Sequence, residues 1–343
     1  TDTIAEVGKD GVVTVEESQS LGIEKEIVEG LEFDRGYVSA YMVTNPERME
    51  AIMRDPLILI TDKKISSVAE ILPVLEKVAQ SGKKELVVVA EDVDGEALTT
   101  LVVNRLRGTF NVLAVKAPGY GDRKGEMLED IASMTGGQVI SEKTGLKFED
   151  ATLEMMGRAQ KVIATKDKTV VVGGKGLKKD IEKRVEQIRR SIKETKSKFD
   201  KEKLEERLAK LTGGVAVIRV GAATETEMKY LKLKIEDAVN ATKAAIEEGI
   251  VPGGGSSLIK AAQKVAESFA KSREKMDAAS RVGYEVVLKA LEMPLRQIAF
   301  NAGVDAGVVV DKVKTAKGNA GYDALNDVVI EDMLAAGIID PLK

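Results

Sequence analysis

The 343-residue sequence contains no cysteine, no histidine and no tryptophan, and aromatic residues make up only 3% of it. These absences exclude disulfide bonds, thiol nucleophiles, imidazole acid–base chemistry and most zinc sites. Any chemistry must therefore rest on carboxylates, lysine, hydroxyl groups or bound Mg²⁺. We predict no metal site built from the side chains of this chain.

The sequence also lacks a strong charge of one sign and a long apolar run. The 52 basic and 56 acidic residues leave a net charge of −4, which predicts neither nucleic acid nor an anionic membrane as a partner. No apolar stretch approaches the roughly 20 residues that span a bilayer, and the first residues lack the pattern of a signal peptide. We therefore expect a cytoplasmic protein, or one from an equivalent reducing compartment.

Three short apolar runs in the first half of the chain are each followed by a helical pattern. The runs cover 57–60, 86–90 and 112–115, and the helical patterns cover 66–80, 95–107 and 123–135. Strands that recur every ~27–29 residues with helices between them indicate right-handed βαβ units on a largely parallel sheet.

Further elements flank this α/β block. We predict strands at 11–16, 169–172 and 215–220, a hairpin of two charged helices joined at 195–200, and a connecting helix at 224–247. The rest is mostly helical. Helices are expected at 256–272, at 278–301 with an interruption at Pro294, and at 304–314, followed by a glycine-rich bend at 318–322 and a final short helix.

The helix predicted near 96–107 has apolar residues around too much of its circumference. They cover about 240° of the helical wheel, whereas a surface helix needs an apolar stripe of a little over ~100°. The helix near 66–79 shows an apolar arc of about 180°, and Pro73 suggests that its regular part starts near Ile71. Two explanations are open: burial between two layers of protein, or an apolar surface that binds a partner.

Some short motifs are compatible with other chemistry. Asp92 and Asp94 lie in an Asp-x-Asp-Gly turn after an apolar strand, as in Mg²⁺-dependent phosphatases of the haloacid dehalogenase type, but carboxylates there are also ordinary helix caps. Glycine-rich turns at 119–122 and 253–257 precede helices and are compatible with phosphate binding or with simple tight turns.

Several longer runs, taken together, resemble the group I chaperonin family of the GroEL type. They cover the chain in order and are distinctive: Val28–Tyr37, Leu72–Glu76, Glu91–Leu98, Leu101–Asn104, Val115–Arg123, Ala209–Ile218 and Gly221–Glu225. The resemblance implies a first intermediate-domain segment at 1–28, an apical domain at 29–213, a second intermediate segment at 214–248 and a partial equatorial domain at 249–343. The implied fold is an α/β apical domain with a parallel-sheet core and a helical hairpin, a small α+β intermediate domain and a mostly α-helical partial equatorial domain.

In this family the apical domain binds non-native polypeptide and the mobile loop of a GroES-type co-chaperonin on an apolar groove. Ala40 and Met42 stand where the family often has Pro and Phe, which keeps the segment apolar but changes its shape. The positions that match the groove, with Asn104 at its edge, are Tyr37, Tyr41, Met42, Leu72, Leu75, Leu98, Val102, Val103 and Asn104.

The resemblance also implies an ATPase in the intact chaperonin. Asp237 matches the carboxylate that positions the attacking water, and nucleotide-contacting positions match Gly253, Gly254, Asp323, Ala324 and Asp340. The family's Gly-Asp-Gly-Thr-Thr-Thr phosphate loop and its Gly-Met-rich tail are not in this sequence. We therefore expect a fragment that binds unfolded polypeptide, holds no ATP or Mg²⁺ by itself, and joins other subunits in a double ring only when intact.

Overall fold

The structure is a computed structural model that describes residues 2–8, 11–272 and 276–343. The chain has a mixed α/β fold, and it divides into two compact units, Thr1–Lys234 and Ile235–Lys343. Each unit has its own hydrophobic core.

The sheet of the first unit contains the three predicted strands. They are β5 (Leu57–Thr61), β7 (Glu85–Ala90) and β9 (Asn111–Lys116), which pair in parallel, with β10 (Val139–Ile140) parallel to β5 on its other side. Helices α2 (Val68–Gln80), α3 (Gly95–Leu106) and α4 (Asp122–Thr135) connect them. The residues of β5 and β7 are almost all buried, as expected for strands covered on both faces.

The same sheet continues with antiparallel strands, so the prediction of a largely parallel sheet is only partly right. β11 (Gly157–Ala164) pairs with β5, β12 (Thr169–Gly174) and β4 (Ala51–Arg54), and β12 pairs with β3 (Gly30–Phe33). A short turn joins β11 to β12, and a connection this short permits only antiparallel pairing.

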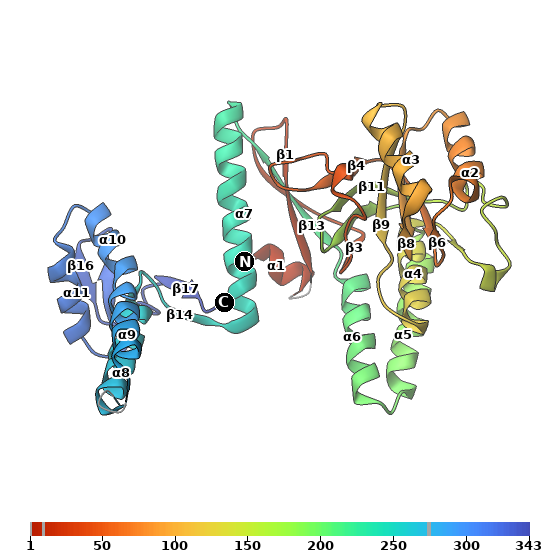
Figure 1. The fold of residues 1–343 in the computed structure, drawn as a ribbon. Coiled ribbons are helices and arrows are strands. Elements are labelled where there is room, and N and C mark those ends of the chain that lie inside the picture. Colours follow the sequence, from red (N-terminus) through yellow and green to blue (C-terminus); the bar gives the residue numbers. More distant parts are fainter. Residues whose placement is uncertain (1, 9–10, 273–275) are drawn as a thin grey trace. The chain divides into compact units, whose positions relative to one another are not determined.

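The predicted helical hairpin is present as α5 (Lys178–Glu194) and α6 (Lys198–Thr212), which lie side by side in Figure 1. Both helices pack on α4. The buried carboxylate of Asp130 on α4 accepts hydrogen bonds from Arg184 Nε (2.6 Å) and from Arg207 Nε (2.8 Å) and Nη2 (3.1 Å). One buried anion therefore ties both hairpin helices to the α/β body.

A small separate sheet is built from chain segments that precede and follow this α/β body in the sequence. β13 (Val215–Gly221) lies between β1 (Val12–Glu17), which is parallel to it, and the antiparallel β2 (Gly22–Val28), and helix α1 (Asp2–Val7) packs against β1 and β13. The sequence predicted β1 and β13 but not β2, whose residues are nearly all exposed and leave no apolar pattern. The division into four domain segments remains a prediction.

The second unit begins within helix α7 (Glu225–Glu248) and is largely helical. Helices α8 (Ser256–Ser272), α9 (Ala278–Ala290), α10 (Met293–Asn301) and α11 (Ala306–Thr315) confirm the predicted series, including the break before Pro294. The predicted final short helix is wrong. A hairpin of β15 (Gly321–Asp323) and β16 (Val328–Ile330) is followed by a turn and by β17 (Ile339–Pro341), which pairs with β14 (Ile250–Pro252).

The carboxylates of Asp323 and Asp332 explain this difference, because each accepts hydrogen bonds from the backbone two and three residues later. Such side-chain bonds favour turns over helix. Among the helices of the described residues, none is both long enough and apolar enough to cross a bilayer.

Candidate functional site

Helix α3 buries only one narrow side. Ala97 and Leu101 lie in the core, and Leu98 and Val102 are half-buried against it. Val103 and Leu106 are 37% and 70% exposed. The apolar excess in this helix is therefore not explained by burial between two layers, since part of it faces solvent.

Helix α2 shows the same division. Ile71, Val74 and Val78 are buried, whereas Leu72 is 43% exposed and Leu75 is half-buried. The helix begins at Val68, after the N-cap residue Ser67, and contains Pro73 in its interior, which corrects the expected start near Ile71.

A short 3₁₀ helix, η1 (Ala40–Met42), carries the third part of the predicted groove. Ser39 caps it, and Tyr41 is 71% exposed. Met42 is fully buried instead, and its sulfur accepts a hydrogen bond from the backbone N–H of Ala114 at 3.2 Å. Tyr37 is also buried and bridges to Val115 of β9. Met42 and Tyr37 therefore belong to the core rather than to the exposed part of this site.

The fold brings these three elements together. Helix α3 contacts both α2 and η1, and Figure 1 shows α2 and α3 as neighbours in the first unit. We call the apolar side chains that these elements expose the α2–α3 surface; its members are Tyr41, Leu72, Leu75, Leu98, Val102, Val103 and Leu106. Leu106 is absent from the predicted site residues, although the wide apolar arc of its helix already pointed to it.

Asn104 is held by the end of its own helix. Its Nδ2 donates to the Thr100 carbonyl at 2.9 Å, and its Oδ1 accepts from the Thr109 hydroxyl at 3.1 Å. These two contacts tie the Asn104 side chain to the backbone of α3 and to the loop that follows the helix.

The second unit brings most of the predicted nucleotide residues into one region. Asp340 on β17 pairs with Val251 on β14, directly before Gly253, whose N–H donates to the Ile338 carbonyl at 3.0 Å. Gly254 has φ +63° and packs near the Tyr322 carbonyl on β15, next to Asp323 and Ala324. Asp237 is exposed on α7.

The glycine turn before α8 is closely packed. A Cβ at Gly253 would lie about 3.0 Å from the backbone of Ile338 and Ile339, so glycine allows the two segments to approach this closely. Backbone N–H groups at such a helix start suit phosphate oxygens.

The Asp-x-Asp turn does not form a metal site. Asp92 is paired with Lys116 at 3.2 Å, and Asp94 is paired with Lys64 at 2.6 Å and accepts a hydrogen bond from Ser66 at 2.6 Å. Hydrogen bonds from Lys64 and Ser66 lower the pKa of the Asp94 carboxyl. Across the ranges that the structure describes, no group of three or more acidic residues is arranged to hold a metal ion.

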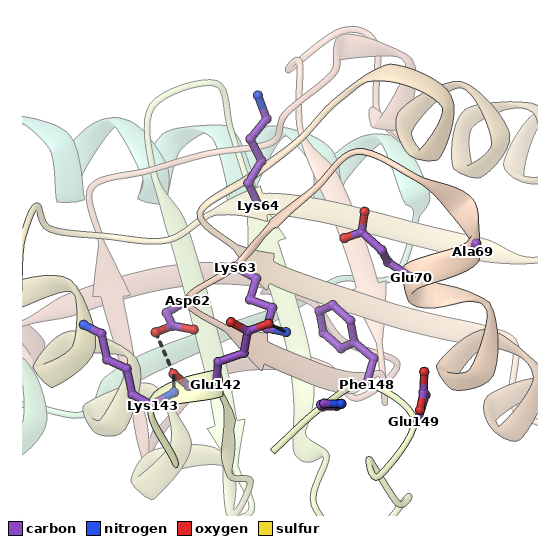
Figure 2. A pocket seen from close by; sticks show the side chains of 11 residues that line it. Asp62, Lys63, Lys64, Ala69, Glu70, Glu142, Lys143, Phe148 and Glu149 are labelled. Carbon is purple, nitrogen blue, oxygen red and sulfur yellow. Dashed lines mark hydrogen bonds and ion pairs between the residues drawn. The ribbon is translucent and has the colours of Figure 1, made fainter. Parts of the chain in front are cut away.

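A cavity of about 580 Å³ in the first unit lies beside the first turn of α2. Figure 2 shows acidic and basic side chains side by side in its lining. Lys63 pairs with Glu142 at 2.6 Å, and Ser141 donates to Asp62 at 2.7 Å. The Lys63 ammonium also lies over the Phe148 ring, 5.5 Å from its centre. These contacts are those of a balanced polar surface, and they leave the α2–α3 surface as the best candidate site.

Comparison with known protein families gives one match that covers nearly the whole chain. The sequence profile of the TCP-1/cpn60 chaperonin family matches residues 2–343.

Proposed function

Because this chain belongs to the TCP-1/cpn60 chaperonin family, we propose that it is a chaperone that binds non-native polypeptides on the α2–α3 surface. Family membership supports a chaperonin function in general, and it does not support the phosphatase alternative. The observation that carries the proposal is the exposure of large apolar side chains from three adjacent elements, with Tyr41 and Leu106 each at least 70% exposed.

The chemistry of this surface suits partners without a fixed sequence. Unfolded chains expose apolar groups in any order, and burying one Leu or Val side chain contributes roughly 1.5–3 kcal/mol. Aliphatic side chains on two helices offer area rather than directed hydrogen bonds, so they select apolar character and not a particular sequence.

We extend the proposal to a nucleotide-driven cycle in the intact ring. Gly253, Gly254, Asp323, Ala324 and Asp340 would hold ATP, and Asp237 would orient water. ATP with Mg²⁺ supplies the differential binding energy that moves such a ring between states. A GroES-type co-chaperonin would bind the same α2–α3 surface, so clients would be displaced into an enclosed chamber.

The experiment that tests polypeptide binding compares two leucines of equal exposure. Leu106 on α3 and Leu177 before α5 are both 70% exposed. Leu106→Glu places a charge in the α2–α3 surface and should weaken capture of a denatured model protein by about tenfold or more, since an unpaired charge opposes apolar contact. Leu177→Glu makes the same chemical change elsewhere and should leave capture within about twofold of wild type.

Circular dichroism and thermal unfolding of both variants show whether the fold is retained. Leu106 is the better choice for this purpose than Leu98 or Val102, because those two side chains also contact the core and a glutamate there would disturb the fold as well. Equal capture by wild type, Leu106→Glu and Leu177→Glu would rule out the α2–α3 surface as the binding site.

A further inference from the structure

Arg105 occupies an unusual position at the edge of the α2–α3 surface. It lies in the last turn of α3, and its side chain reaches across to the segment that carries Tyr41. Its Nη2 donates to the Val43 carbonyl at 3.1 Å, and its Nη1 makes a longer contact of 3.5 Å with the Tyr41 carbonyl. The guanidinium thus contacts the carbonyl groups of the residues on either side of Met42, at the end of η1.

The surroundings of Arg105 are not those of an ion pair. No carboxylate of the described residues lies within 4.0 Å of its guanidinium, and burial lowers its pKa, with only a weaker opposing effect from the charge of Glu85. Withdrawing a cation from water costs free energy unless its hydrogen bonds are replaced. Here the replacement partners are two backbone carbonyls of the Tyr41 segment, so the interaction serves the position of that segment.

The Tyr41 segment is anchored on its core side. Val38 N–H donates to the Ala114 carbonyl at 2.9 Å, Val43 packs against the core, and Thr44 N–H donates to the Glu50 carbonyl at 2.9 Å. The side chain of Met42 points into the core towards Ala114, and a single turn of 3₁₀ hydrogen bonds, from Met42 N–H to Ser39 and from Val43 N–H to Ala40, shapes the backbone. A 3₁₀ turn of three residues has weak hydrogen-bond geometry. These contacts hold η1 on the core side, and the guanidinium of Arg105 adds hydrogen bonds that join the end of η1 to α3.

We propose that Arg105 is a positioning residue that holds the Tyr41 segment against α3 and so completes one wall of the α2–α3 surface. The proposal rests on the proposed function of that surface. In it, Arg105 touches no client and acts through the backbone of Tyr41 and Val43. Its fork of N–H groups can reach two carbonyls at once, which the single ammonium of a lysine matches poorly.

The first measurement reports the position of the segment without any client. The chain contains no tryptophan, so Tyr41→Trp introduces a single fluorescent reporter at the exposed position. Adding Arg105→Met, which keeps an unbranched apolar side chain, should lower the fluorescence anisotropy of Trp at position 41. Adding Arg107→Met instead should leave the anisotropy unchanged, because Arg107 is an exposed cation at the same helix end.

The second measurement reports capture of a denatured model protein by the chain with Tyr41 intact. Arg105→Met should raise the apparent dissociation constant by about fivefold, because only a fraction of molecules then presents the complete surface. Arg105→Lys should recover part of the loss, and Arg107→Met should stay within about twofold of wild type. Thermal unfolding should be nearly the same for the Arg105 and Arg107 variants.

The outcomes separate this proposal from the function on which it rests. Unchanged anisotropy in Arg105→Met overturns the positioning by Arg105, whatever the client data show. Lower anisotropy with unchanged capture overturns its link to binding. If neither wild type nor Arg107→Met captures a client, the proposed function fails, while the anisotropy still decides whether Arg105 holds the segment.

Discussion

Neighbouring residues of one short segment have opposite environments, and this contrast sets their functions. Tyr41 is largely exposed, whereas Met42 is fully buried with its sulfur against the Ala114 amide. In η1 successive side chains diverge by about a third of a turn, so two adjacent apolar residues do not face the same way. Family resemblance assigns both to the groove, but only the backbone conformation shows which of them reaches solvent.

We expect Met42→Ala and Tyr41→Ala to have opposite effects. Met42→Ala leaves a cavity in the core and should lower the free energy of unfolding of the first unit by about 2–5 kcal/mol. Tyr41→Ala removes an exposed side chain, so it should change stability little and weaken client capture by several-fold. Thermal unfolding and a capture assay on both variants check this. A stable Met42→Ala protein would contradict the core position of its side chain.

Asp323 gives a pH-dependent prediction at the same scale. Its carboxylate accepts hydrogen bonds from Asn326 Nδ2 (2.7 Å) and from the N–H groups of Asn326 (3.2 Å) and Leu325 (2.9 Å), and these bonds lower its pKa. A carboxyl whose pKa is lowered by folding stabilises the folded state above its ordinary pKa. That contribution is lost as the pH falls through the lowered value.

Titration of the Asp323 carboxyl by NMR should therefore show a pKa below the usual range for aspartate. Asn326→Ala removes the first and strongest of these hydrogen bonds, so it should move the pKa back towards that range. An unchanged pKa in Asn326→Ala would mean that the backbone N–H groups alone account for the shift.

At the scale of elements, the sequence predicts helices and strands well where a buried face produces a periodic or continuous apolar pattern. The strands β5, β7 and β9 and the helices between them are found within one or two residues of the predicted limits, because continuous apolar runs and helical spacing mark them. β2 was not predicted, because as an exposed edge strand it has no buried face to produce alternation. The final helix was wrongly predicted because turn-forming aspartates overrode the local helical pattern.

The candidate site shows the same limit. The apolar arcs of α2 and α3 were compatible with burial between two layers or with an exposed apolar surface, and the exposure of part of each arc in the structure favours the second. The contribution of Arg105 was not predictable, because it depends on the long-range approach of two backbone carbonyls about sixty residues earlier in the chain. Pairings between distant segments leave no periodic signal in a sequence.

The ion pairs of Asp130 on α4 with Arg184 and Arg207 join the helical hairpin to α4, and they give a prediction for the hairpin as a whole. Asp130 is buried between Arg184 and Arg207, and removing it takes away the carboxylate that both guanidinium groups share, although Arg207 keeps its pair with Glu126. Asp130→Ala should destabilise the packing of α5 and α6 by about 3 kcal/mol. The matched control is Asp180→Ala, which breaks only an exposed pair with Lys183 and should cost at most about 0.5 kcal/mol.

Hydrogen exchange of the α5 and α6 amides measures this effect locally. Faster exchange of both helices in Asp130→Ala, with Asp180→Ala close to wild type, is the expected result. Equal exchange in the two variants would show that apolar packing alone holds the hairpin on α4, without the ion pairs of Asp130.

At the scale of the whole chain, the two units have separate cores. The main core of the first unit is built from the large sheet, α2 to α4 and the hairpin, while the core of the second unit lies among Ile259, Leu295, Ala299, Val309, Val310, Val313 and Tyr322. The α2–α3 surface depends only on the first core. Client binding and the integrity of the glycine turn before α8 should therefore respond to different mutations.

Gly255→Ala tests this independence. Gly255 has φ +77°, which is strained for alanine, and a Cβ there would lie 2.8 Å from the Leu295 backbone nitrogen. The substitution should destabilise the second unit by about 2 kcal/mol or more, because strain at such a position adds to the clash. Hydrogen exchange should quicken in α10, α11 and β15 but not in α2 or α3, and capture of a denatured protein should remain within about twofold of wild type.

Gly283→Ala is the control, since Gly283 lies within α9 and an added Cβ there meets open space. Loss of capture in Gly255→Ala alone would show that the α2–α3 surface depends on the second unit after all.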